Sequence, residues 1–169
     1  LTFLIREILR NIPEHAKTNT IWICGQYWPS YELAEIAIID EGIGIFKSIT
    51  QNAAHREYIT DNITALQWAL KAGISEAFKP SIKQRSNDEW ANSGFGLYMV
   101  NEICKYLNGS FCIISYGNYM LIDNHGIKIG DTLFEGTAIR MRVPSKRIAN
   151  AQSIISQIAK QGECEAKTI

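Results

Sequence analysis

Two groups of strand-like segments, separated by helical ones, constrain this chain's fold more than any other feature of its sequence. The strand-like segments are residues 20–27 and 33–40, then 110–116, 119–123 and 136–143; the helical patterns are 2–16, 61–72 and 94–109. Strands grouped in this way, rather than alternating singly with helices, are typical of an antiparallel sheet with helices on one face. We therefore predict an α+β fold, a two-layer α/β sandwich with helices packed on one face of a mixed, mainly antiparallel sheet.

Turn and cap residues mark several boundaries. Asp61 is suited to cap the start of the second helix, and Gly73 stands where a helix-terminating residue belongs. Gly117-Asn118 predicts a tight turn between the third and fourth strands. Residues 124–135 are predicted to form a loop.

The strand at 33–40 is apolar at most positions, so we expect much of both its faces to be buried. Cys24 and Cys112 also lie in apolar, strand-like runs, where a reduced cysteine behaves as a small hydrophobe. We therefore predict that both cysteines belong to the core. The four cysteines contain no CxxC pair, so a zinc site is not indicated.

Length and charge limit the function classes. A chain of 169 residues fits one domain, and 17 basic against 17 acidic side chains leave no net charge. A general nucleic-acid binder would show a basic excess, so nucleic acid is not an indicated partner. No apolar run approaches the roughly 20 residues that span a bilayer, and we expect a cytoplasmic protein. Since the first residue is Leu1, we expect the chain to be part of something longer.

Polar residues recur along one side of the first helix. Glu7, Asn11 and His15 stand at i, i+4 and i+8. The amide oxygen of Asn11 could serve as a ligand for Mg²⁺, and the carboxylate of Glu7 could serve as a base that orients a nucleophile. A solvated helix face is the simpler interpretation of this line when it is taken alone.

Glycines interrupt the chain directly after the strand at 33–40. Asp40 ends that strand and can accept a hydrogen bond from the amino group of adenine. Gly42 and Gly44 allow the backbone to approach a flat ring, with Ile45 following. A tight turn with an acidic start is the alternative.

A second glycine pair opens the helix at 94–109. The run Gly94, Phe95, Gly96 and Leu97 offers free N–H groups at a helix N-terminus to anionic oxygens. No strand precedes this run, which disfavours a Rossmann site, and the chain contains no Walker P-loop. Gly136-Thr137 opens the last strand and by itself marks only a strand start.

Taken in order, these four patterns resemble the N, G1, G2 and G3 boxes of the GHKL ATPases, named for gyrase, heat-shock chaperone, histidine kinase and mismatch-repair proteins. The resemblance spans about residues 2–144 and implies a Bergerat-type fold that binds ATP and Mg²⁺. It implies Asn11 as the metal ligand, Glu7 as the catalytic base, and Asp40 with Thr137 as readers of adenine. The implied cofactor-binding set also includes His15, Gly42, Gly44, Ile45, Gly94, Phe95, Gly96 and Leu97.

The resemblance also implies a domain plan. Residues 1–145 would form the ATP-binding domain, with 46–93 as a mobile lid, and residues 146–169 a helical tail or linker. Three activities stay open: an ATPase or ATP-driven switch, the catalytic domain of a histidine or serine kinase whose phosphoacceptor lies elsewhere, and a nucleotide-binding module without turnover. Relatives in this family often act as dimers or through partner proteins, so a partner domain and a homodimer are further expectations.

Overall fold

The computed structural model describes residues 5, 9, 16–18, 20–74, 95–146 and 151–167, and for 151–153 the backbone alone. Its six strands are β1 (Ile21–Trp28), β2 (Leu33–Asp40), β3 (Ser110–Ser115), β4 (Asn118–Asp123), β5 (Gly126–Asp131) and β6 (Thr137–Pro144). They form one sheet in the order β1-β2-β6-β3-β4-β5, and each of the five neighbouring pairs is antiparallel.

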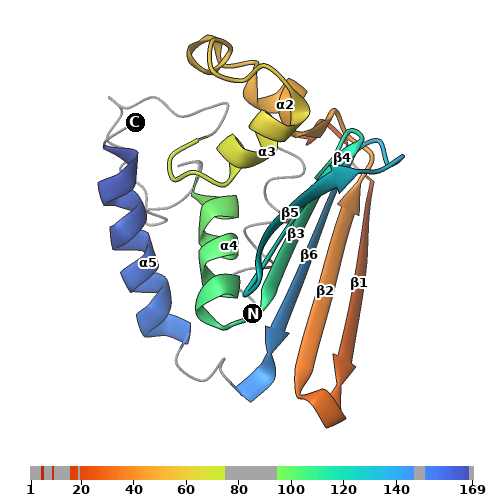
Figure 1. The fold of residues 1–169 in the computed structure, drawn as a ribbon, viewed down its shortest axis with the longest axis vertical. Helices are drawn as coiled ribbons and strands as arrows, with labels where there is room; N and C mark the ends of the chain where they lie inside the picture. Colours follow the sequence, from red (N-terminus) through yellow and green to blue (C-terminus); the bar gives the residue numbers. More distant parts are fainter. Residues whose placement is uncertain are drawn as a thin grey trace.

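The α-helices form the second layer. They are α2 (Gly44–Ile49), α3 (Asn62–Ala69), α4 (Gly96–Tyr106) and α5 (Ala151–Ala166), with short 3₁₀ turns η2 (Pro29–Tyr31) and η3 (Ala53–His55). Figure 1 shows all four on one side of the sheet, with α2 and α3 at one end of the strands, α4 beside the strands, and α5 packed on the far side of α4. The predicted two-layer α+β fold is confirmed, and no parallel pair occurs among these six strands.

The core lies between the sheet and the helices. Its largest fully buried side chains come from both layers: Phe111, Ile38, Leu66, Ile113, Met120, Met141, Val100, Val143 and Cys104. Burial raises the pKa of the Cys104 thiol to about 12, so this cysteine behaves as an apolar core residue. Within the described ranges, no helix is long and apolar enough to cross a membrane.

Helix α3 begins where its cap residue predicts. The Asp61 side chain accepts a hydrogen bond from the Thr64 N–H at 2.7 Å, and this bond lowers the carboxyl pKa. The helix ends at Ala69, earlier than predicted, and Gly73 follows with a φ of 79°. Leu66 of α3 is fully buried against the sheet.

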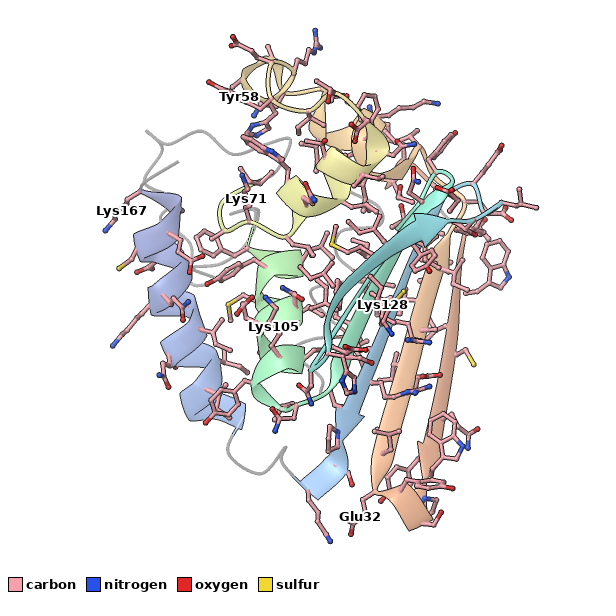
Figure 2. All side chains as sticks on the ribbon, viewed as in Figure 1. Glu32, Tyr58, Lys71, Lys105, Lys128 and Lys167 are labelled. Carbon is pink, nitrogen blue, oxygen red and sulfur yellow. The ribbon has the colours of Figure 1, made fainter. Side chains whose placement is uncertain are left out.

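An aromatic cluster holds the segment around α3. The Tyr58 and Trp68 rings stack with centroids 5.4 Å apart, and the Lys71 Nζ lies 4.1 Å from the Trp68 ring centroid. Figure 2 shows Tyr58 and Lys71 at the end of the molecule that carries α2 and α3, far from Glu32 at the tip of the β1–β2 hairpin. These residues fall in the 46–93 segment expected to form a lid, whose bounds stay a prediction.

Two elements were missed in the sequence. Residues 126–131 form strand β5 inside the predicted loop, and 44–49 form helix α2 in a stretch interpreted as irregular and polar. Strand β5 is a short edge strand with glycine at 126 and 130, residues that weaken a strand signal. Helix α2 has only six residues, too few for a clear helical period.

Three predictions of burial differ from the structure. Cys112 is only half-buried, because it pairs with Arg140 on the sheet face opposite the buried Phe111 and Ile113. Cys24 is exposed, because β1 is an edge strand and Cys24 pairs with Ala37 on the sheet face away from the helices. Strand β2 is fully buried only at Ile38 and Asp40, since its other face carries no helix. On that outer face Glu35 instead accepts a hydrogen bond from Arg142 Nε at 2.8 Å.

The β3–β4 turn lies one residue earlier than predicted. Ser115 pairs with Asn118, so the two turn residues are Tyr116 and Gly117. Both have positive φ, 45° and 89°, as a type I′ hairpin turn requires. This shift brings the Tyr116 ring toward α2, where it contributes to the site below.

Candidate functional site

Three buried polar side chains form a row across the centre of the sheet. Asp40 ends β2, Thr137 opens β6 and Ser115 ends β3, and each is the register partner of the next. All three are buried. The row lies at the end of the strands beside α2 (Figure 1). Antiparallel pairing thus joins residues that are 97 and 22 positions apart in sequence.

Asp40 is a buried carboxylate held mainly by backbone donors. Its Oδ1 accepts a hydrogen bond from the Gly42 N–H at 2.8 Å. Burial raises the carboxyl pKa, and the backbone hydrogen bonds of Gly42 and Thr137 lower it in part. Among the described residues, Asp40 forms no ion pair. A carboxylate has about four acceptor positions, so it retains capacity for a further neutral donor.

The glycine loop after Asp40 lies against the end of the first segment. The Ile43 N–H donates to the Ala16 carbonyl oxygen at 2.9 Å. A Cβ atom on Gly42 would stand 2.6 Å from the Ala16 Cβ, too close for any side chain. Gly42 therefore permits the close approach that joins this loop to Ala16, the last residue of the first helical pattern.

Ser115 fixes the other end of the same loop. The Ile45 N–H donates to the Ser115 Oγ at 2.9 Å in a buried position. Gly44 has a φ of 75°, and a Cβ there would lie 2.5 Å from the Tyr116 ring. Ser115 was not among the predicted site residues, because a serine that ends an apolar run has no distinguishing signal until its strand partner is known.

Tyr116 joins α2, α3 and the β3–β4 turn. Its carbonyl oxygen accepts a hydrogen bond from Asn62 Nδ2 at 2.8 Å. Its hydroxyl accepts one from Lys47 Nζ at 3.3 Å, and that ammonium lies 4.7 Å from the ring centroid. The short helix α2 is thus fixed over the polar row from two sides, by Tyr116 and by Ser115.

The second glycine run opens α4, as predicted. The helix begins at Gly96, with Phe95 as its N-cap residue and Leu97 half-buried. The Phe95 ring lies edge-on to the Tyr98 ring with centroids 6.2 Å apart. A Cβ atom on Gly162 of α5 would stand 2.8 Å from the Phe95 ring. Phe95 therefore packs between α4 and α5.

Four predicted site residues, Glu7, Asn11, His15 and Gly94, lie outside the described residues. The roles assigned to them stay predictions. The structure does bring together Asp40, Gly42, Gly44, Ile45 and Thr137 at one end of the sheet. Within the described ranges, no group of three or more His, Cys, Asp or Glu side chains forms a metal site.

The solved structures that resemble this fold include two from one enzyme. Both are of the ATPase region of Saccharomyces cerevisiae topoisomerase II, at 14% identity and a TM-score of 0.49. The first alignment covers 92% of this chain and 43% of that one; the second, from a structure bound to ICRF-187 (dexrazoxane), covers 87% and 39%. The chain therefore spans less than half the length of either.

Sequence comparison gives the family. No curated protein is significantly similar to the chain. A family model for the histidine kinase-, DNA gyrase B- and HSP90-like ATPases matches residues 1–147, which is most of the 169-residue chain. That match includes every residue of the polar row and both glycine runs. The chain belongs to the histidine kinase-, DNA gyrase B- and HSP90-like ATPase family, whose GHKL domains bind ATP.

Proposed function

We propose that this domain binds Mg-ATP with the adenine ring against the Asp40–Thr137–Ser115 row. The buried Asp40 carboxylate is the observation that carries the proposal. Its charge is not balanced by any described cation, and its raised pKa records the cost of burial. An adenine amino group would donate to this carboxylate and offset part of that cost, whereas a guanine carbonyl would oppose it.

The neighbouring residues would fix the pocket without contacting the reacting atoms. In this proposal the Thr137 hydroxyl shares the adenine contact with Asp40. The Ser115–Ile45 hydrogen bond holds the glycine loop at one end, and the Ile43–Ala16 hydrogen bond holds it at the other. A loop fixed in this way loses little conformational entropy when the base binds, which favours affinity.

The phosphates would lie toward the N-terminus of α4. Backbone N–H groups near Gly94, Gly96 and Leu97 would face anionic oxygens there, assisted by the positive end of the helix dipole. Asn11 would hold Mg²⁺, which supplies charge neutralisation of the phosphate oxygens. Glu7 would orient the attacking nucleophile.

The segment 46–93 would serve as the lid. Helices α2 and α3 occupy part of that segment, and they bury Ile49 and Leu66 in the core. Lid closure would exclude water from the γ-phosphate.

We propose ATP hydrolysis, or lid closure used as a switch, as the activity. A protein kinase is the second candidate, because the Glu7-Asn11-His15 line also resembles that of anti-sigma serine kinases. Release of phosphate by the isolated chain supports hydrolysis. Transfer of labelled γ-phosphate to a second protein, with little release in its absence, supports a kinase. Tight binding with neither outcome supports a nucleotide-binding module.

Calorimetric titration with ATP, ADP and GTP, with and without Mg²⁺, tests the binding site. We expect Asp40→Asn to abolish detectable adenine-nucleotide binding, because its amide presents a donor to a donor. Asp123→Asn is the matched control: Asp123 also ends a strand and accepts the N–H two residues on, from His125 at 2.8 Å, but at the far end of the sheet. Equal affinity losses in the two variants would contradict the proposed pocket.

Turnover is tested separately from binding. Glu7→Ala should retain nucleotide affinity and lose phosphate release or transfer, since the base acts only in the chemical step. Normal turnover by this variant would show that the base assignment is wrong, while leaving the Asp40 pocket intact.

A further inference from the structure

Strand β1 forms an unusually apolar edge of the sheet. It is first in the sheet order, so among the described strands it has a neighbour on one side only. Its eight residues, Ile21–Trp28, include no charged side chain and no proline. Three apolar side chains in it are about half exposed: Trp22 at 47%, Ile23 at 54% and Tyr27 at 49%. Soluble proteins usually protect such an edge from pairing with other chains.

The opposite edge shows the usual protection. Strand β5 is shorter, with six residues, and it carries Lys128 and Asp131 together with two glycines. Charge and glycine both weaken strand pairing at an edge. Ile127 of β5 is 63% exposed, more than any of the three apolar side chains of β1. The two edges therefore differ in charge and length rather than in whether they expose apolar groups.

Strand β1 is complementary to a second copy of itself that runs in the antiparallel direction. Ile23 and Tyr27 both lie on the helix-bearing face, opposite Ile38 and Ala34 of β2. An antiparallel pairing of two β1 strands centred on Gly25 would place Ile23 opposite the partner's Tyr27. The same pairing would place Trp22 opposite the partner's Trp28 on the outer face. Aromatic pairs and aromatic–β-branched pairs are favourable across strands.

We propose that two copies of this chain associate through their β1 strands, which would pair antiparallel. The two-fold axis that relates the copies would pass through Gly25, perpendicular to the sheet. The sheet would then run continuously through both copies, with the described helices of both copies on the same side. Because β1 has no charge, this pairing brings no like charges together. A β1–β1 contact also closes after two copies, whereas pairing β1 with β5 would continue into an open chain of molecules.

This surface is separate from the nucleotide pocket. The polar row begins on β2, and β1 contributes only Ile21 beside Asp40. The proposal therefore does not depend on the proposed function, and nucleotide binding and association can be measured independently. It also places a dimer contact within the domain itself, rather than in segments outside the family match.

Sedimentation velocity of the full chain over a wide concentration range tests the association. We expect a concentration-dependent monomer–dimer equilibrium, and Ile23→Lys should shift it to monomer by placing two unpaired charges in the contact. Ile127→Lys is the matched control on β5 and should leave the equilibrium unchanged. Both positions are more than half exposed, so both variants should fold, which circular dichroism will check.

A charge-pair variant tests the register. Tyr27→Glu alone should weaken the dimer, as Ile23→Lys does. The variant that combines both substitutions should dimerise more tightly than either single variant, because each introduced lysine then faces the carboxylate introduced at position 27 of the other copy. A monomer at all concentrations in the unchanged chain would overturn the proposal. Loss of the dimer in Ile127→Lys, or a double variant no better than the single ones, would also overturn it.

Discussion

Two neighbouring rows of side chains cross the same three strands on the same face, and they differ only in chemistry. Ile38, Ile139 and Ile113 form one row by register pairing. The other row, Asp40, Thr137 and Ser115, lies two residues away on each strand, about 6.8 Å from the first. All six side chains are between 0% and 9% exposed. The two rows are equally buried but contribute oppositely to the free energy of unfolding. Burial of the apolar row stabilises the fold, whereas burial of the polar row carries a desolvation cost.

We therefore expect substitutions in one row to change stability and substitutions in the other row to change nucleotide affinity. Substitutions in the apolar row should lower the free energy of unfolding and leave the affinity of the folded protein intact. Substitutions in the polar row should do the reverse, to the extent that each polar group contacts ligand rather than protein.

The largest expected effect is on stability, in Ile113→Ala. Ile113 is fully buried, so truncation loses its transfer free energy and leaves a cavity. We expect a loss of about 2–5 kcal/mol in the free energy of unfolding, measured by urea denaturation. ATP affinity at a temperature where the variant is folded should be unchanged. A parallel loss of affinity would show that the two rows are not independent.

Asp40→Asn should produce the largest effect on affinity. A hydrogen bond to a charged group contributes about 1.5–3 kcal/mol, so affinity should fall by at least about tenfold and, with donor facing donor, beyond detection. The amide oxygen can still accept from the Gly42 N–H, and no carboxylate is left to desolvate. The melting temperature of the nucleotide-free protein should therefore be unchanged or higher. A strongly destabilised variant would contradict this account.

Ser115→Ala tests the member of the polar row that contacts protein. Removing its Oγ leaves the buried Ile45 N–H without its acceptor, which costs about 1–3 kcal/mol. We expect lower stability by that amount and weaker ATP binding, because the glycine loop is no longer fixed. Thermal denaturation and calorimetry together measure both. A loss of affinity with no loss of stability would mean that Ser115 contacts the ligand directly.

Thr137→Val should have a smaller effect. Valine keeps the branched shape in the strand and removes only the hydroxyl. One neutral hydrogen bond contributes about 0.5–1.5 kcal/mol, so ATP affinity should fall by up to about tenfold while the free energy of unfolding stays within about 0.5 kcal/mol. Unchanged affinity would remove Thr137 from the adenine contact.

The smallest expected effect is the change in stability and ATP affinity with pH that the titration of Asp40 causes. Its raised pKa means that the folded state holds this proton at pH values where the unfolded chain, with a pKa near 3.8, has lost it. This group's contribution to stability is thus fully present below 3.8 and is lost as pH rises through the folded pKa. ATP affinity should change in the opposite sense and weaken as pH falls through the same range. In Asp40→Asn, the part of the pH dependence of stability that Asp40 causes should be absent, which denaturation at a series of pH values measures.

The sequence was most informative where a signal is local. The Asp61 cap, the start of α4 at the second glycine run, and the place of Asp40 at the end of β2 all follow from a few adjacent residues. It was least informative at edges. The pattern predicts a loop where β5 forms and a core position for Cys24. Neither the neighbouring residues nor the periodicity of a strand indicates whether it lies at the edge or the centre of the sheet.

Local sequence signals are enough to predict helices α3 and α4, five of the six strands, the two-layer class, and the four ordered motifs that identify the family. No local signal indicates that Ser115 lies beside Thr137, that Tyr116 fixes α2, or that β1 is an exposed edge; these features appear once the strands pair. Periodicity and capping act within one or two turns of chain, whereas strand register and order depend on pairing segments up to about a hundred residues apart. That pairing is set by the packing of the whole sheet.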